Sequence, residues 1–321
     1  MQRQRCHPVA MEAPELRARI AWGLISEPGD TLAWQLHREL GPSESLGQVL
    51  GSRSIRALQR RLSQRLDAGV PLERLSAYRD RYTADRVQRA LDVQLEQDIT
   101  AISSDHPWWP PRLSDLGECG PSTLWVKGSL HQASGAQAVA IVGSSRPTRS
   151  GRQDAIALAE CALENGLTIL SGGTRGISTD AHRRALNSGG ISVAVVSGGL
   201  ESVYPPDNAS LFARVLQRGA LVSEVPATVP STISGLLARN RLIAALADGV
   251  VMVQAEYRSG ATSVGYHASA LGRHVGIVPG LWNDTRSAGC WRIYRDCGAI
   301  VLTEPAELSL VIPGVTLPTR I

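Results

Sequence analysis

The chain has 321 residues, 43% of them hydrophobic, which is enough for two domains with a sizeable core. Its formal charge of +4 is compatible with a polyanionic partner but does not require one. The sequence shows no signal peptide and no long apolar run, and its five scattered cysteines lack metal-ligand spacing, so we expect a cytoplasmic protein without membrane contact, disulfides or bound metal.

Residues 1–10 are expected to be disordered, and residues 11–103 to form a small helical domain. Apolar residues recur at helical spacing over 16–24, 32–40, 58–66 and 87–99, and no strand pattern interrupts them. The one basic cluster in this part comprises Arg53, Arg56, Arg60 and Arg61. We interpret it as a solvated face, with contact to nucleic acid as the alternative.

We expect residues 104–135 to form a connector rich in proline and tryptophan, and residues 313–321 to form a tail. The adjacent Trp108 and Trp109 lie between prolines. We expect this pair to pack the connector onto a domain; the alternative is a stacking platform for nucleic-acid bases.

Residues 136–312 alternate between apolar runs and amphipathic helical patterns, which predicts a doubly wound, mostly parallel α/β sheet. Two of these runs end in loops of small residues and arginine. The first loop contains Gly143, Ser144, Ser145 and Arg146, and the second contains Ser171, Gly172, Gly173, Arg175 and Gly176. Such loops emerge at the carboxyl ends of adjacent strands, where helix starts favour anions, so we predict a phosphate site there. The alternative is that the glycines only make tight turns.

A nicotinamide cofactor is disfavoured, because no G-x-G-x-x-G follows the first run and the second ends in Ser171 rather than an acid. A further candidate segment opens a later helix, with two arginines flanking an asparagine. It contains Ser234, Gly235, Arg239, Asn240 and Arg241. Spacing alone leaves two alternatives open for these arginines: contact with an anion, or a structural ion pair with Asp248 or Glu256.

Taken together, these motifs resemble the DprA/Smf family of DNA-processing proteins over residues 12–310. They include VAIVGSSRPT at 139–148, SGGTRGI at 171–177, SGGLESVYPPDN at 197–208, RNRLIAALADGVVMVQA at 239–255 and SGATSVG at 259–265. The resemblance implies an extended Rossmann-like domain preceded by a helical, sterile-alpha-motif-like domain. It also implies a homodimer, formed through the Rossmann-like domain, that binds and protects single-stranded DNA and loads a RecA-type recombinase in natural transformation and homologous recombination.

The resemblance assigns no catalytic residue and no cofactor, and it assigns DNA phosphates to the loops already named, together with Ser259 and Gly260. Four positions depart from the usual family pattern. Ser145 stands where an arginine is usual, Ser178 where an aspartate is usual, Leu236 where a phenylalanine is usual, and Val264 near the end of a motif that is usually polar. The chain ends at Ile321, so we expect no carboxyl-terminal winged helix.

Two other functions are alternatives. The first is a nucleotide-processing enzyme of the phosphoribohydrolase-like group, which needs a Pro-Gly-Gly-x-Gly-Thr-x-x-Glu loop that this chain lacks; Glu201 and Glu224 are the nearest acids. The second is a sensor that binds a small nucleotide through the same loops without chemistry.

Overall fold

The amino-terminal helices follow the apolar spacing of the sequence. In the computed structural model, which describes residues 11–130 and 136–315, these helices are α1 (Ala13–Ile25), α2 (Thr31–Gly51), α3 (Ile55–Leu66), α4 (Leu72–Arg81) and α5 (Ala84–Glu96). Trp22 lies in their core, with the rings of His37 and Tyr78 edge-on at 4.9 and 5.1 Å. The helical unit therefore has an apolar centre of its own.

Among the described residues, nine strands form one sheet in the order β1-β2-β6-β5-β4-β3-β7-β8-β9. The strands are β1 (Thr100–Ile102), β2 (Leu124–Gly128), β3 (Ala138–Val142), β4 (Thr168–Ser171), β5 (Ser192–Val195), β6 (Gly219–Ser223), β7 (Gly249–Met252), β8 (His274–Ile277) and β9 (Ile300–Val301). All neighbouring pairs from β6 to β9 are parallel. The chain moves outward from β3 to β6 and then returns to β7 on the other side of β3. This reversal creates the crevice in which open α/β sheets bind ligands.

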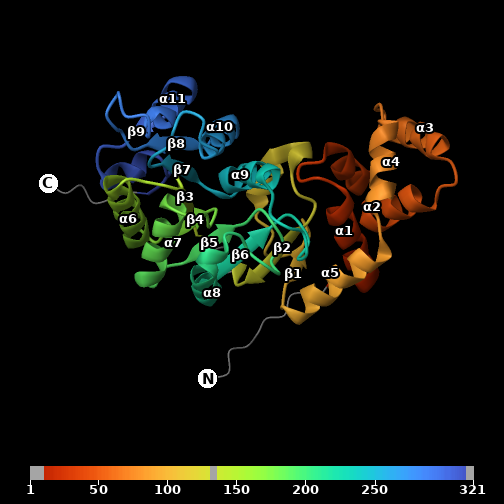
Figure 1. Ribbon diagram of the computed structural model, residues 1–321. Coiled ribbons are helices and arrows are strands. Elements are labelled where there is room, and N and C mark those ends of the chain that lie inside the picture. Colours follow the sequence, from red (N-terminus) through yellow and green to blue (C-terminus); the bar gives the residue numbers. More distant parts are fainter. Residues whose placement is uncertain (1–10, 131–135, 316–321) are drawn as a thin grey trace.

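Helices cover both faces of the sheet (Figure 1). One face carries α6 (Arg149–Glu164), α7 (Ile177–Asn187) and α8 (Ala209–Arg218), and the other carries α9 (Ile233–Leu246), α10 (Thr262–Ala270) and α11 (Ala288–Cys297). The described residues also include the 3-10 helices η1 (Pro111–Cys119), η3 (Pro206–Asn208) and η4 (Pro305–Leu310). The expected doubly wound, Rossmann-like arrangement behind a helical unit is confirmed.

The sheet extends beyond the segment where the sequence predicts it. β1 falls in the stretch expected to lack strands, and β2 falls in the expected connector and pairs antiparallel with both β1 and β6. β1 is too short for an alternating pattern to show, whereas Trp125 in β2 is fully buried because the strand is covered on both faces. Helices α1 and α5 pack against this end of the sheet (Figure 1), so the helical unit is joined to it by strands and side chains.

Candidate functional site

A cleft of about 200 Å³ lies at the carboxyl ends of β3 and β4, beneath α9 and the start of α10. Among the described residues, none of those that line it is acidic. They are Val142, Gly143, Ser145, Ser171, Gly172, Thr174, Ser178, Leu236, Leu237, Arg239, Asn240, Ile243, Ser259, Gly260, Ala261 and Val264. The two Gly/Arg loops and the later helix therefore meet at one place, as the strand pattern predicts.

Helix starts surround this cleft. Because α6, α7, α9 and α10 follow β3, β4, β6 and β7 in the chain, each begins at the same edge of the sheet. Their amino-terminal ends carry partial positive charge and favour an anion. The hydroxyls of Thr148 and Thr232 cap α6 and α9, but no side chain caps α7, whose N-cap is Gly176.

Ser178, in the first turn of α7, is an unsatisfied donor that lines the cleft. The residue is 4% exposed, and its Oγ has no hydrogen-bond partner in the described part of the chain. A buried hydroxyl without a partner costs free energy, so a bound acceptor would be favourable here. The position that departs from the family's aspartate is thus a neutral donor instead of a negative charge.

Arg239 is a buried positive charge on the wall of the cleft. It is 6% exposed, and its Nη1 donates to the carbonyl oxygens of Gly172, at 2.8 Å, and Val195. No described carboxylate pairs with it, its Nε has no partner, and burial lowers the guanidinium pKa to about 10. A buried charge without a counterion is costly, so this wall favours an anion.

The neighbouring residues of the same helix hold other parts of the molecule. Asn240 donates to Gly260 O at 2.9 Å and Ser263 Oγ at 2.7 Å, which fixes the loop before α10. Arg241 forms a nearly buried ion pair with Glu224 at 2.5 Å, and Glu224 accepts from the amide of Gly29 in the helical unit. Of the two alternatives left open for these arginines, Arg241 forms a structural ion pair, but with Glu224 and not with Asp248 or Glu256. Asp248 pairs with Arg112 instead.

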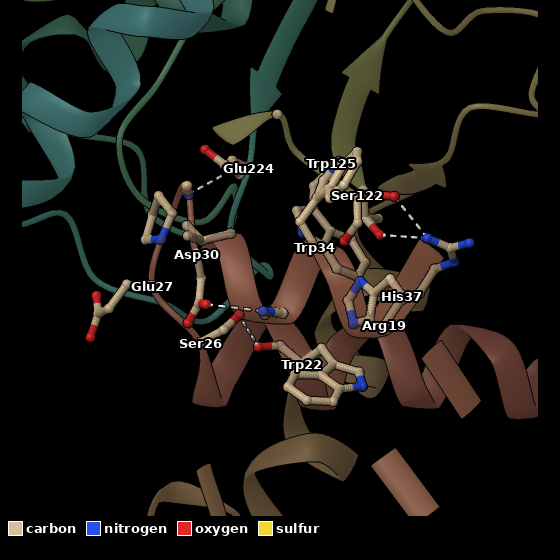
Figure 2. A pocket seen from close by; sticks show the side chains of 17 residues that line it. Arg19, Trp22, Ser26, Glu27, Asp30, Trp34, His37, Ser122, Trp125 and Glu224 are labelled. Atoms are coloured by element: carbon tan, nitrogen blue, oxygen red, sulfur yellow. Dashed lines mark hydrogen bonds between the residues drawn. The ribbon is translucent and has the colours of Figure 1, made fainter. Parts of the chain in front are cut away.

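Figure 2 shows this junction between the helical unit and the sheet, with Glu224 facing the loop between α1 and α2, and with Trp22 and His37 on the helices. The hollow there measures about 50 Å³, room for little more than water. Arg241 thus joins the two parts of the chain and does not line the cleft.

The small residues of the two loops serve packing first. Gly176 has φ +79°, and a Cβ there would overlap Ser144 O; a Cβ at Gly172 would overlap the guanidinium of Arg239. The hydroxyl of Ser171 donates to Ile141 O at 2.6 Å and is fully buried. The turn-making alternative therefore accounts for much of the glycine pattern.

Exposed arginines frame the cleft, and they differ in how free they are. The guanidinium groups of Arg146, Arg149 and Arg258 form no ion pair with any described residue. In contrast, Arg175 pairs with Asp207 at 2.5 Å and Arg152 with Asp180 at 3.0 Å. A phosphate chain that approaches the cleft would therefore meet free positive charge at Arg146, Arg149 and Arg258, whereas the charges of Arg175 and Arg152 are already paired.

The structure places part of the predicted set on the cleft wall: Gly143, Ser145, Ser171, Gly172, Arg239, Asn240, Ser259 and Gly260. The remainder lies behind or beside it: Ser144, Arg146, Gly173, Arg175, Gly176, Ser234, Gly235 and Arg241. Thr174, Leu237 and Ala261 line the cleft without having been singled out. In the sequence, only their position next to the motifs indicates that these three residues line the cleft.

In the ranges 11–130 and 136–315, no group of His, Cys, Asp and Glu side chains gathers as metal ligands. None of the helices described there is long and apolar enough to cross a membrane.

The chain belongs to the family of DNA recombination-mediator protein A, whose model matches residues 100–312. It is 31% identical over 237 residues to DNA processing protein DprA of Streptococcus pneumoniae, covering 73% of this chain and 80% of that protein. It is 38% identical over 209 residues to protein Smf of Escherichia coli, covering 64% of this chain. The chain spans only 55% of the Smf protein and 60% of a DprA protein of Mycobacterium tuberculosis.

Solved structures agree with the fold. The structure of DprA from S. pneumoniae superposes with a TM-score of 0.73 at 22% identity, covering 95% of this chain and 99% of that one. DNA processing protein A from Helicobacter pylori, whose structure addresses its single-stranded DNA binding mode, superposes with a TM-score of 0.59 at 26% identity. That match covers 65% of this chain and 93% of the H. pylori chain.

Proposed function

We propose that this protein binds the sugar-phosphate backbone of single-stranded DNA along the cleft and its rim of arginines. In the cytoplasm it protects the strand and passes it to a RecA-type recombinase, in natural transformation or homologous recombination, without catalysing a reaction. Membership of the recombination-mediator family supports this role. The single-stranded DNA binding of the H. pylori relative supports the choice of ligand.

The observation that carries the proposal is the charge of Arg239. Its guanidinium is buried on the cleft wall with no carboxylate beside it among the described residues, and the unpartnered hydroxyl of Ser178 lines the same cleft. A phosphate would supply both the counterion and the acceptor. Arg146, Arg149 and Arg258 would then hold neighbouring phosphates without reading the base sequence.

Fluorescence anisotropy of a labelled oligo-dT strand over a salt series tests the site. We expect wild-type affinity to fall steeply with salt, because each phosphate contact contributes a slope of about 0.7. Arg146→Ala/Arg149→Ala should lower that slope by roughly 1.4 and keep the thermal stability. Ser178→Ala should weaken binding about fivefold with little change in slope, because it removes one neutral hydrogen bond. Arg214→Ala, an exposed arginine on α8, is the matched control and should bind like the wild type.

Two outcomes would overturn the site. If Arg214→Ala weakens binding as much as the loop variants do, the contact is diffuse. If dTMP competes as well as an oligonucleotide of the same total phosphate, the small-nucleotide sensor becomes the better function.

The enzyme alternative lacks its acid. Glu201 receives both Nη hydrogen bonds of Arg89, and Glu224 is held by Arg241, so both candidate acids are engaged outside the cleft. Incubation of the protein with nucleoside monophosphates should therefore release no free base.

Recombinase loading is tested directly by adding the protein to a strand already covered by a single-strand binding protein and following filament growth.

A further inference from the structure

A second cavity, of about 350 Å³, lies at the opposite edge of the sheet, where the parallel strands begin. Its wall is formed by the first residues of β3 and β4, by the carboxyl end of α9, and by the tryptophans that precede η1. The side chains used below are Trp108, Trp109, Arg112, Thr168, Leu170 and Asp248. Its volume falls in the range of small-molecule sites, about 300 to 1,000 Å³.

The cavity is apolar with one unsatisfied polar group. Thr168 is 1% exposed, and its Oγ1 has no partner among the described residues. It shares a strand face with Leu170, while both tryptophans pack, partly buried, against the same core. A buried hydroxyl that faces an apolar hollow favours a ligand that offers a single hydrogen bond within an otherwise flat, apolar outline.

The charges around this cavity exclude an anion. The carboxyl end of α9 carries partial negative charge, and Asp248 lies just beyond it. The carboxylate of Asp248 is bound by Arg112 and by the amide of Ala138 at 2.8 Å, so the guanidinium there is already neutralised. A phosphate would thus meet no free positive charge, in contrast to the cleft at the other edge.

From this geometry we infer a binding site for an uncharged heteroaromatic ring of nucleoside size, held against Trp108 and Trp109 and hydrogen-bonded to Thr168. Aromatic walls accept any flat π-face, and the hydroxyl accepts or donates one bond. The ring is either a free nucleoside or a base of a bound strand.

Titration of the full chain with adenosine, guanosine and thymidine, followed by calorimetry and by tryptophan fluorescence, tests the site. We expect saturable binding of at least one nucleoside, and at least tenfold weaker binding of its 5′-monophosphate. Thr168→Val has the same shape without the hydroxyl, so it should keep or raise the unfolding temperature and weaken nucleoside binding about tenfold. Arg146→Ala/Arg149→Ala should leave nucleoside binding unchanged.

Absence of saturable binding for all three nucleosides would overturn the proposal, as would unchanged affinity in Thr168→Val. If an oligonucleotide displaces the nucleoside from the wild type, the natural occupant is a base of a strand. If it does not, the occupant is a free nucleoside. Failure of DNA binding at the cleft would leave the nucleoside titrations of the wild type and of Thr168→Val unaffected.

Discussion

Arg175 shows how an exposed arginine can be neutralised before any ligand arrives. Its guanidinium bonds the carboxylate of Asp207 through Nε at 2.9 Å and through Nη2 at 2.5 Å. The pair is exposed, so it is weak and screened by salt, but it still cancels the charge that a phosphate would meet.

Asp207→Asn is therefore expected to strengthen binding of oligo-dT at low salt, by a factor of roughly two to five. The gain should vanish at high salt, because screening removes the difference between the variants. Anisotropy titrations at two salt concentrations measure it. Asp115→Asn, which breaks the Arg273 pair away from the cleft, is the matched control. Equal gains in both variants would show a general effect of net charge instead.

His182 makes stability depend on pH. The ring is fully buried beside Ser192, and burial, with a smaller contribution from the charge of Arg239, lowers its pKa to about 4. The unfolded chain binds a proton near pH 6.5, so stability conferred by the neutral ring is lost as pH falls from about 6.5 towards 4. Between pH 7.5 and 5 the loss amounts to about 2 kcal/mol.

Urea unfolding of the wild type and His182→Gln at these two pH values measures that loss. The variant should lose about 2 kcal/mol less than the wild type on acidification. Buried His37, with a pKa of about 3, still contributes in both proteins and cancels in the comparison. An identical pH dependence in the two proteins would contradict the assignment.

At the residue scale, the sequence predicts positions better than roles. The three segments that meet at the cleft were identified from strand ends and small residues, yet Arg239 and Arg241 differ in a way that no spacing reveals. Whether an arginine meets an acid depends on residues brought close by the fold, and Glu224 comes from another strand end. The importance of Ser178 emerges only when its hydroxyl is seen to lack a partner.

At the scale of elements, α9 binds three parts of the molecule together through consecutive side chains. Arg239 donates hydrogen bonds at the ends of β4 and β5, and Asn240 donates to the loop before α10. Arg241 pairs with Glu224, which in turn accepts a hydrogen bond from the amide of Gly29. These three contacts fix the middle of α9 in place, and they thereby hold the start of the helix at the cleft.

Glu224→Ala is expected to destabilise the protein by about 3 kcal/mol, because it leaves the charge of Arg241 nearly buried without a partner. Glu224→Leu/Arg241→Met removes both charges and should recover most of that loss. The free energy of unfolding in urea checks both variants. If the double variant is no more stable than Glu224→Ala, the lost packing and not the unpaired charge is responsible.

Long, periodic elements were predictable and short ones were not. The apolar spacing of α1, α2, α3 and α5 is visible in the sequence, whereas α4 buries only Leu75 and Tyr78. β1 has three residues, too few for any period, and its place beside β2 depends on a partner strand. The parallel strands β3 to β8 were predictable because each is a continuous apolar run.

At the scale of the whole molecule, an apolar projection lies after β8. Leu281 is 73% exposed and Trp282 is 90% exposed, while Tyr294 on α11 is 45% exposed. Large apolar side chains in such exposure are typical of contact surfaces. We propose that they form the interface of the homodimer that the resemblance to the DprA/Smf family implies.

Leu281→Ser/Trp282→Ser should therefore shift the protein from dimer to monomer in analytical ultracentrifugation, with the unfolding temperature nearly unchanged. Ile233→Ser, at another exposed apolar position (82%), serves as the control and should remain dimeric. A monomeric wild type would contradict the dimer, and a dimeric double variant would place its surface elsewhere.

The insertion of β2 into the sheet also determines the order in which the chain can mature on a ribosome. Trp125 in β2 pairs with Ser223 in β6, and Val139 in β3 pairs with Gly249 in β7, so each of these two strands emerges long before one of its two neighbours. The helical unit has its own core around Trp22, and all the residues of that core are synthesised before the strands of the sheet. The nascent protein would therefore carry a finished helical unit followed by the β1-β2 pair, in which the outer edge of β2 is still open. Only the synthesis of β6 would cover that edge and protect it from chaperones and proteases.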